Sequence, residues 1–180
     1  GAHLTIDDRR LGFIWDAPNA NIVLRRSDRG LTGETDLALR IGEMSAAFRI
    51  NADYDAAAKL LALDVAFADF NPSLLAGVSK KAELLRLANF PANGTASLVT
   101  GLDGGLKSAR FDITAGPGII GAGPAAALSL RVKAGRLTGR YDHAEELLSI
   151  DNLTLDLGEN GQIELPAPIS HASPLTKISL

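Results

Sequence analysis

Apolar and polar side chains alternate with a period of two along most of this 180-residue chain. Long runs lie within residues 20–25, 36–41, 46–52 and 61–68, and shorter ones within 96–100, 109–113 and 128–132. Because successive side chains of a β-strand point to opposite faces of a sheet, each run makes one apolar face and one polar or small face. This pattern is typical of antiparallel sheet, so we expect a mainly β fold.

Turn-forming residues separate the alternating runs. Asp103-Gly104-Gly105 lies between two of them, and Asn160-Gly161 lies between 155–157 and 162–165. Asp-Gly and Asn-Gly supply the positive φ angles of tight hairpins. We therefore predict an extended, curved antiparallel sheet of hairpins, a β-groove. The alternative is a closed β-sandwich.

One stretch of sequence occurs twice. The residues from Tyr54-Asp55 to Asp69 recur, with the same internal spacing, from Tyr141-Asp142 to Asp156. Each copy is typical of a strand end, a polar turn and a second strand. In the later copy the apolar positions change parity between Ile150 and Leu153, which predicts a β-bulge near Asn152.

One segment breaks the alternation. Asn71-Pro72 is typical of a helix start, with Asn71 as the N-cap and Pro72 in the first turn. Apolar residues then recur at helical spacing. We expect one amphipathic helix over about residues 72–87.

Composition excludes several classes of protein. A net charge of −3 and a pI near 5.6 argue against nucleic acid as a partner. The absence of cysteine excludes disulfides and thiolate metal sites. No apolar run reaches the ~20 residues of a membrane-spanning helix. Residues 1–3 resemble a cloning remnant, and we expect residues 4–180 to be a single β-rich domain or a segment of a longer β-groove protein.

Two sequence features could indicate an enzyme or a metal site. Residues 116–121 match the G-x-G-x-x-G pattern, with Asp142 at the spacing of a ribose-binding acid. A strand-like run follows at 128–132 where a dinucleotide site needs a helix, so we interpret the motif as a kinked edge or bulge. The histidines, His3, His143 and His171, are too far apart in sequence to suggest a shared metal.

Charged residues have a simpler interpretation than catalysis. A pair of carboxylates could act as general acid and base, and the candidates are Asp36, Asp64, Asp112, Asp151 and Asp156. Each lies opposite an apolar stripe, which indicates a solvated sheet face. Arg25, Arg26 and Arg29 could meet phosphate headgroups, as could Lys80-Lys81, but neighbouring acids dilute both patches. We expect no catalytic residue, no cofactor and no metal.

The apolar stripe recurs in nearly every strand and is the main candidate site. It could be the core of a sandwich with sheets about 10 Å apart, or an open groove for acyl chains. Aromatic residues make up only 5% of the chain, which favours the groove. The stripe comprises Leu37, Leu39, Phe48, Ile50, Leu61, Leu63, Val65, Phe67, Leu98, Phe111, Ile113, Leu128, Leu130, Leu148 and Ile150.

The order of several short motifs resembles a known family. They are Leu31-Thr32-Gly33-Glu34-Thr35-Asp36-Leu37-Ala38-Leu39, Ala52-Asp53-Tyr54-Asp55-Ala56-Ala57, Leu61-Ala62-Leu63-Asp64, Phe70-Asn71-Pro72-Ser73-Leu74-Leu75-Ala76, Gly94-Thr95-Ala96-Ser97-Leu98, Asp103-Gly104-Gly105-Leu106, Ala115-Gly116-Pro117-Gly118 and Leu165-Pro166. Over most of residues 20–168 the chain is similar to the central region of YhdP-like members of the AsmA-like superfamily of Gram-negative bacteria.

This resemblance implies a segment of a cell-envelope protein that is anchored in the inner membrane and spans the periplasm. The family's long β-groove is linked to phospholipid transport and outer membrane biogenesis, and it has no catalytic residues. The partners implied are phospholipid acyl chains and the adjoining segments of the parent protein. The helix would cap or plug an edge or end of the groove. The alternative function is a structural or protein-binding β-domain of the envelope without a lipid ligand.

Overall fold

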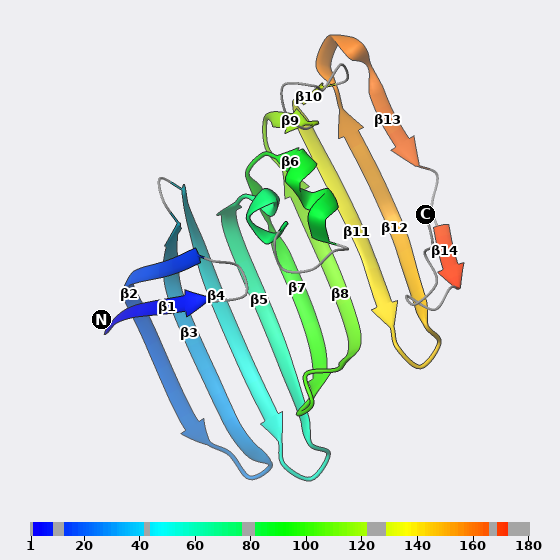
Figure 1. The fold of residues 1–180 in the computed structure, drawn as a ribbon. Helices are drawn as coiled ribbons and strands as arrows, with labels where there is room; N and C mark the ends of the chain where they lie inside the picture. The colour runs from blue at the N-terminus through cyan, green and yellow to red at the C-terminus, as the bar shows by residue number, and fades with distance from the viewer. Residues whose placement is uncertain are drawn as a thin grey trace.

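A single large antiparallel sheet dominates the chain (Figure 1). The computed structural model describes residues 2–8, 13–41, 44–76, 82–121, 129–165 and 169–172. The strands of the large sheet are β1 (Ala2–Asp8), β2 (Phe13–Arg26), β3 (Gly30–Ile41), β4 (Met44–Asp55), β5 (Leu60–Phe70), β7 (Ala92–Gly101), β8 (Leu106–Ala115), β11 (Ala134–Asp142), β12 (Leu147–Asp156), β13 (Gln162–Leu165) and β14 (Ile169–Ala172).

The strands lie side by side in the order in which the chain forms them. The order is β1-β2-β3-β4-β5-β7-β8-β11-β12-β13, and β14 also pairs with β12. The expectation of a mainly β, antiparallel fold is confirmed. The closed sandwich is wrong, because the sheet is open and the second sheet in the described residues has only three short strands.

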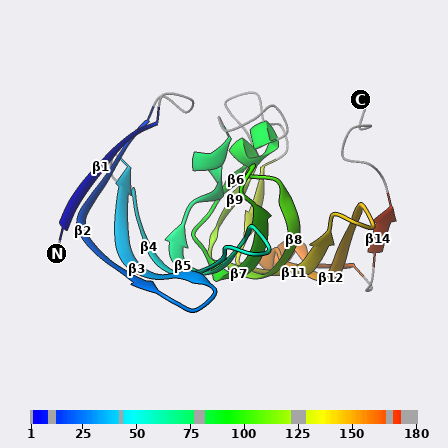
Figure 2. The same cartoon turned by 90° about the horizontal axis from the view of Figure 1, so that it is seen from below.

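The smaller elements lie over the middle of the large sheet, on the side toward which it curls (Figure 2). The small sheet consists of β10 (Leu130–Val132), β9 (Gly118–Ile120) and β6 (Ala88–Asn89). Beside it lie two 3-10 helices, η1 (Pro72–Leu75) and η2 (Ala82–Leu87). A third, η3 (Gly158–Asn160), joins β12 to β13.

The expected helix over residues 72–87 is not confirmed. The described residues form two short 3-10 helices there, and residues 77–81 lie outside the described part. Its predicted start is confirmed, because the Asn71 side chain accepts a hydrogen bond from the Ser73 backbone N–H at 3.0 Å and Pro72 occupies the first turn.

Cross-strand register gives the large sheet two chemically different faces. Leu37 of β3 lies opposite Phe48 of β4, and Phe48 lies opposite Phe67 of β5. Residues opposite one another in antiparallel strands share a face, so apolar side chains gather on one side, the apolar face. The other side, the polar face, carries mainly aspartate, arginine, serine, threonine and alanine.

The apolar face is the inner side of the curl. Several of its small side chains are nearly inaccessible: Ala17 is 1% exposed, Ala20 2% and Ala92 1%. Alanines on the polar face, such as Ala38 and Ala47, are exposed. Side chains crowd together on the inner side of a curved sheet and spread apart on the outer side, which accounts for the difference.

The repeated sequence forms two equivalent hairpins, β4–β5 and β11–β12. In the first, Asp55 Oδ1 accepts a hydrogen bond from the Ala58 backbone N–H at 2.8 Å. In the second, Asp142 Oδ1 accepts one from Ala144 N–H at 2.8 Å. The last turn residue has a positive φ in both hairpins, 55° at Lys59 and 49° at Glu146. The repeat therefore specifies a turn conformation.

Several β-bulges interrupt the register, and two of them determine which residues of β5 and β12 reach the apolar face. Opposite β11, Asn152 pairs with Thr138 and Ile150 with Gly139, so Asp151 has no opposite residue there. The bulge predicted near Asn152 is confirmed. A second bulge lies in β5, where φ of Asp69 is 57° and its N–H donates to the Asn93 side-chain oxygen at 3.0 Å.

Candidate apolar binding face

The apolar face consists of rows of residues that cross the sheet, and one of these rows has no polar side chain. One row consists of Leu37, Phe48, Phe67, Gly94, Ile113, Leu137, Leu153 and Leu165, each opposite the next. Neighbouring rows contain Ile50 and Val65, and Leu63 and Leu98. These rows form a hydrocarbon surface that extends from β3 to β13.

Most of the predicted stripe lies on this face. The residues placed there by strand register are Leu37, Leu39, Phe48, Ile50, Leu61, Leu63, Val65, Phe67, Leu98, Phe111, Ile113, Leu148 and Ile150. The placement of Leu130 was wrong, because it lies in β10 of the small sheet, opposite Ile120, and does not join the large sheet. Leu128 lies outside the described residues.

Three phenylalanines link the sheet to the elements above it. Ring centroids are 6.5 Å apart for Phe48 and Phe67, 5.7 Å for Phe48 and Phe70, and 6.1 Å for Phe67 and Phe70. The last two pairs are edge-to-face, an arrangement that the charge distribution of aromatic rings favours. Phe70 ends β5 just before η1, whose Leu74 is buried. The cluster therefore lies on the apolar face at the end of β5 that leads into η1.

Phe70 also belongs to this face, which the alternation of the sequence does not predict. Strict alternation from Phe67 assigns Phe70 to the polar face, but the bulge at Asp69 turns it back to the apolar face. Leu137, Leu153 and Leu155 were also missed as candidates and lie on the apolar face. The available signal was an aspartate that lies between two apolar residues three positions apart in the sequence. This pattern occurs at the bulges in β5 and β12.

Glycines accept aromatic rings on the same face. A Cβ atom added to Gly139 would lie 2.7 Å from Phe111 Cζ and 2.5 Å from the Ser149 carbonyl oxygen. The Phe111 ring therefore occupies the space that a side chain would take on the neighbouring strand. Such pairing of an aromatic residue with glycine keeps the surface apolar while the strands bend.

The apolar face is only partly covered. In the described residues no large side chain is fully buried, and the aliphatic residues of the central strands are half-buried. The face offers methyl and methylene groups and aromatic rings, with few hydrogen-bonding groups. It can bind apolar chains through burial of hydrocarbon surface, at about 0.8 kcal/mol per CH₂.

Ion pairs between neighbouring strands cover the polar face. Arg49 Nε lies 2.7 Å from Asp36 Oδ1, and Arg136 makes two contacts with Asp112, of 3.1 and 2.8 Å. The hydrogen-bonded Arg136 guanidinium lowers the pKa of the Asp112 carboxyl from its ordinary value, although partial burial opposes this shift. Exposed pairs of this kind favour solubility over catalysis, because a general acid needs a raised pKa.

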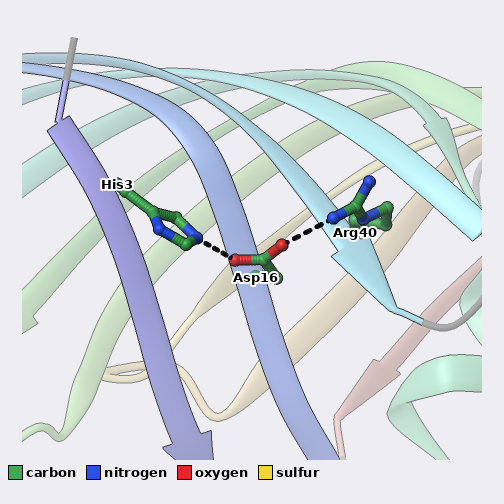
Figure 3. A network of polar contacts seen from close by, with 3 residues as sticks. All are labelled: His3, Asp16 and Arg40. Atoms are coloured by element: carbon green, nitrogen blue, oxygen red, sulfur yellow. Dashed lines mark hydrogen bonds and ion pairs between the residues drawn. The ribbon is translucent and has the colours of Figure 1, made fainter.

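A three-residue network joins the first strands on the polar face (Figure 3). Asp16 of β2 lies 2.5 Å from His3 of β1 and 2.8 Å from Arg40 of β3. Hydrogen bonds from His3, and secondarily from Arg40, lower the pKa of the Asp16 carboxyl. His3 thus takes part in the sheet even though it belongs to the expected cloning remnant.

The five aspartates considered as an acid and base pair are dispersed across the polar face. Asp36, Asp64 and Asp112 lie on different strands, and Asp64 accepts a hydrogen bond from Ser97 Oγ at 2.6 Å. Asp156 lies farther along, on β12, with its carboxylate bonded to the Gly158 N–H at 2.8 Å. Asp151 occupies the bulge, 3.5 Å from Arg140. Their partners are arginine, serine and backbone groups.

A shallow hollow of about 550 Å³ lies over β2 to β5. Each strand contributes consecutive residues to it, so its lining includes residues of both faces. Leu37, Phe48 and Phe67 belong to the apolar face, whereas Asp36 and Arg49, which form an ion pair, belong to the polar face.

The glycine motif forms part of the small sheet. Gly118, Ile119 and Ile120 make β9, the central strand between β10 and β6, so the interpretation as an edge was wrong. The N–H of Gly116 donates to the Pro91 carbonyl at 2.8 Å, and that of Gly121 to the Leu87 carbonyl at 2.9 Å. The N–H groups of Gly116 and Gly121 therefore form hydrogen bonds within the fold.

The three histidines lie on different elements of the fold. His143 lies in the β11–β12 turn, where Nδ1 is 3.1 Å from the Tyr141 hydroxyl, and His171 lies in β14. The described residues contain no group of three or more side chains suited to a metal ion. In the same part of the chain, no helix has the length and apolar character needed to cross a membrane.

Comparisons with known proteins give no relative. No protein-family description, curated protein or solved structure matches the chain.

Proposed function

We propose that this chain is a segment of a bacterial envelope protein whose apolar face binds, and helps to conduct, phospholipid acyl chains between the inner and outer membranes. In this proposal the curled sheet is a β-groove in the periplasm, and η1 and η2 cover part of it. The family resemblance of the sequence supports the choice of phospholipid. The parent protein would be anchored in the inner membrane.

One observation carries the proposal. A sheet of this size has a continuous apolar face, yet no large side chain in the described residues is fully buried. A closed core would bury several such side chains, whereas a face that receives a mobile apolar ligand stays accessible. The ion-paired polar face is suited to water. In this proposal the polar face contacts water and the apolar face contacts acyl chains.

The first test is native mass spectrometry of protein purified from bacteria. The proposal predicts co-purifying phospholipid that is released by detergent. Protein free of phospholipid that also fails to bind added phospholipid would favour the alternative, a structural or protein-binding domain.

A matched pair of variants ties binding to the correct face. Leu63 and Ala62 are neighbours in β5 that point to opposite faces, Leu63 opposite Leu98 and Ala62 opposite Asp53. Leu63→Lys places a charge on the apolar face and should reduce bound phospholipid at least tenfold. Ala62→Lys adds the same charge beside a carboxylate and should leave binding unchanged. Equal losses in two folded variants would contradict the proposal.

A further inference from the structure

Polar side chains on the apolar face gather at one end of it. This end, the turn end, is where the chain passes from β2 to β3, from β4 to β5, from β7 to β8 and from β11 to β12. Cross-strand register divides the face into five rows between β2 and β12. The polar residues of the three rows nearest the turn end are Arg26, Thr35, Tyr54, Thr100 and Tyr141.

The two rows farthest from the turn end contain only apolar residues and glycine between β3 and β13. One of them is the row from Leu37 to Leu165 described above. The last row consists of Leu39, Ala46, Phe70, Ala92, Ala115, Gly135, Leu155 and Ile163. The polarity of the face therefore falls along the strands, away from the turn end.

Accessibility falls in the same direction. Near the turn end, Leu31 is 49% exposed and Leu106 37% exposed. In the last row, Ala46 is 7% exposed and Ala92 1%. The smaller elements lie at this second end, the covered end, because η1 follows β5 there and β9 follows β8 (Figure 1). An apolar chain on the face is thus best shielded from water at the covered end.

Strand register separates the three arginines near the β2–β3 turn. Arg25 and Arg29 form ion pairs with polar-face carboxylates of β3 and β4, at 2.9 and 3.2 Å. Arg26 lies opposite Leu31, which lies opposite Tyr54, so Arg26 belongs to the apolar face. A guanidinium in this position can bind a phosphate while its methylene groups lie on hydrocarbon.

Both tyrosines of the chain also lie near the turn end, one in each copy of the repeated sequence. Tyr54 lies opposite Leu61 and Tyr141 opposite Leu148, and both tyrosines are half-buried. The Tyr141 hydroxyl lies 3.1 Å from Nδ1 of His143, which belongs to the turn. Tyrosine suits a boundary between hydrocarbon and water, because its ring is apolar and its hydroxyl forms hydrogen bonds.

We propose that a phospholipid on this face lies along the strands, with its phosphate at the turn end near Arg26 and Tyr54 and its acyl chains directed to the covered end. This inference rests on the proposed function and adds the headgroup site and the orientation. The five rows span about 26 Å, at ~3.3 Å per residue. The acyl chains of one bilayer leaflet need about 15 Å, half of the hydrocarbon core, which leaves room for the headgroup.

The opposite orientation is unfavourable. It would place the phosphate over rows that offer only methyl and methylene groups, aromatic rings and glycine. A charge taken from water without a hydrogen-bonding partner carries a large desolvation penalty. It would also leave the acyl chains at the more exposed end of the face.

Photo-cross-linking tests the orientation in the unaltered protein. Two phosphatidylglycerols serve as probes, one with a diazirine at the end of an acyl chain and one with a diazirine in the headgroup. The acyl probe should label residues 67–70 and 92–94, and the headgroup probe residues 26–31 and 54–61, as located by mass spectrometry. The same labelling pattern from both bound probes, or the reverse pattern, would overturn the orientation.

A pair of variants tests the headgroup site. Decyl phosphate and decanol share an apolar chain and differ in the phosphate. Wild-type protein should bind decyl phosphate about two- to fivefold more tightly, as expected of an exposed charge pair. Arg26→Gln should remove this preference, and Arg25→Gln, the control, should keep it. Equal effects of the two variants would contradict a role for Arg26.

Two further outcomes separate the possible sources of failure. Inorganic phosphate at the same concentration should not displace decyl phosphate, because the apolar chain supplies most of the affinity. Displacement would identify a site for free phosphate and overturn the headgroup assignment. A protein that binds neither decanol nor any phospholipid would contradict the proposed function itself, whereas binding without a preferred orientation would contradict only this inference.

Discussion

Single side chains on the two faces stabilise the sheet by different means. On the polar face, charge pairs such as Arg136 with Asp112 join neighbouring strands. On the apolar face, contacts depend on volume, as where Phe111 lies against Gly139. Substitutions on one face should therefore respond to pH, and those on the other to side-chain size.

The pair of Asp112 and Arg136 should make stability depend on pH in the acid range. The pKa of Asp112 is lowered in the folded protein, below the ~3.9 of an unfolded chain. Its contribution is therefore present above about pH 4 and is lost as the pH falls through the folded pKa. Asp112→Asn should destabilise the protein at neutral pH and have little effect in acid, measured by urea unfolding across pH. In an Arg136→Gln background the effect at neutral pH should largely disappear.

Two glycines on the apolar face should differ in their tolerance of a methyl group. Gly139→Ala brings Cβ against the Ser149 carbonyl oxygen and the Phe111 ring, and should cost about 1–3 kcal/mol. Gly33→Ala meets only the flexible end of the exposed Leu24, at 3.1 Å, and should change stability by less than about 0.5 kcal/mol. Urea unfolding compares them, and equal costs would show that the contact with Phe111 does not determine the effect.

At the scale of elements, hairpins with specific turns order the sheet. The β4–β5 and β11–β12 turns share an aspartate that accepts from the backbone and a last residue with positive φ. The strands that they join run beside their neighbours without a crossover. Local turn geometry therefore determines most of the register.

Glycine should be preferred at the last position of each repeated turn. Lys59 and Glu146 adopt the left-handed conformation, which costs a residue with a side chain roughly 1 kcal/mol. Lys59→Gly and Glu146→Gly should each raise the free energy of unfolding by up to about 1 kcal/mol. Ala58→Gly, one position earlier, adds only backbone entropy and should lower it. Thermal unfolding distinguishes these outcomes, and a loss of stability in all three variants would contradict the assigned role of the turn.

At the scale of the whole molecule, the sheet is most cohesive in its middle. There the strands are long and paired on both sides, whereas β13 and β14 are short and each pairs with β12. The phenylalanine cluster and η1 add cover near β4 and β5. Stability should therefore fall from the centre towards both edges.

Hydrogen exchange should reveal this gradient. Amides of β4, β5, β7 and β8 should exchange most slowly, and those of β1 and β13 most rapidly, because opening an end strand breaks pairing on one side only. Mass spectrometry of peptides after timed exchange provides the measurement. Uniform protection from β1 to β13 would indicate that the sheet opens as one cooperative unit.

The alternation of the sequence was sufficient to predict most strands of the large sheet and its two faces. It placed Leu37, Phe48 and Phe67 on one side because period two is a property of each strand alone. It misplaced Leu130, since the pattern does not specify which sheet a strand joins. It missed Phe70 because a positive φ at a single residue, Asp69, reverses the side of everything that follows.

The segment over residues 72–87 was harder to predict for a different reason. Apolar spacing there fits an α-helix, yet the described residues form short 3-10 helices. Leu74 is buried, and η1 packs against η2 and β6, contacts between separate elements that local periodicity does not record. Tertiary packing of this kind can override local helix propensity.

The order of strands in the sheet also has a mechanical consequence. Because the strands of the large sheet follow one another in sequence order from β1 to β12, the first and last strands lie at opposite ends of the sheet (Figure 1). Tension between these ends acts across the strands and loads one ladder of hydrogen bonds at a time, as in opening a zipper. We expect the molecule to lengthen in small steps at low force, and to recover by adding strands back in reverse order.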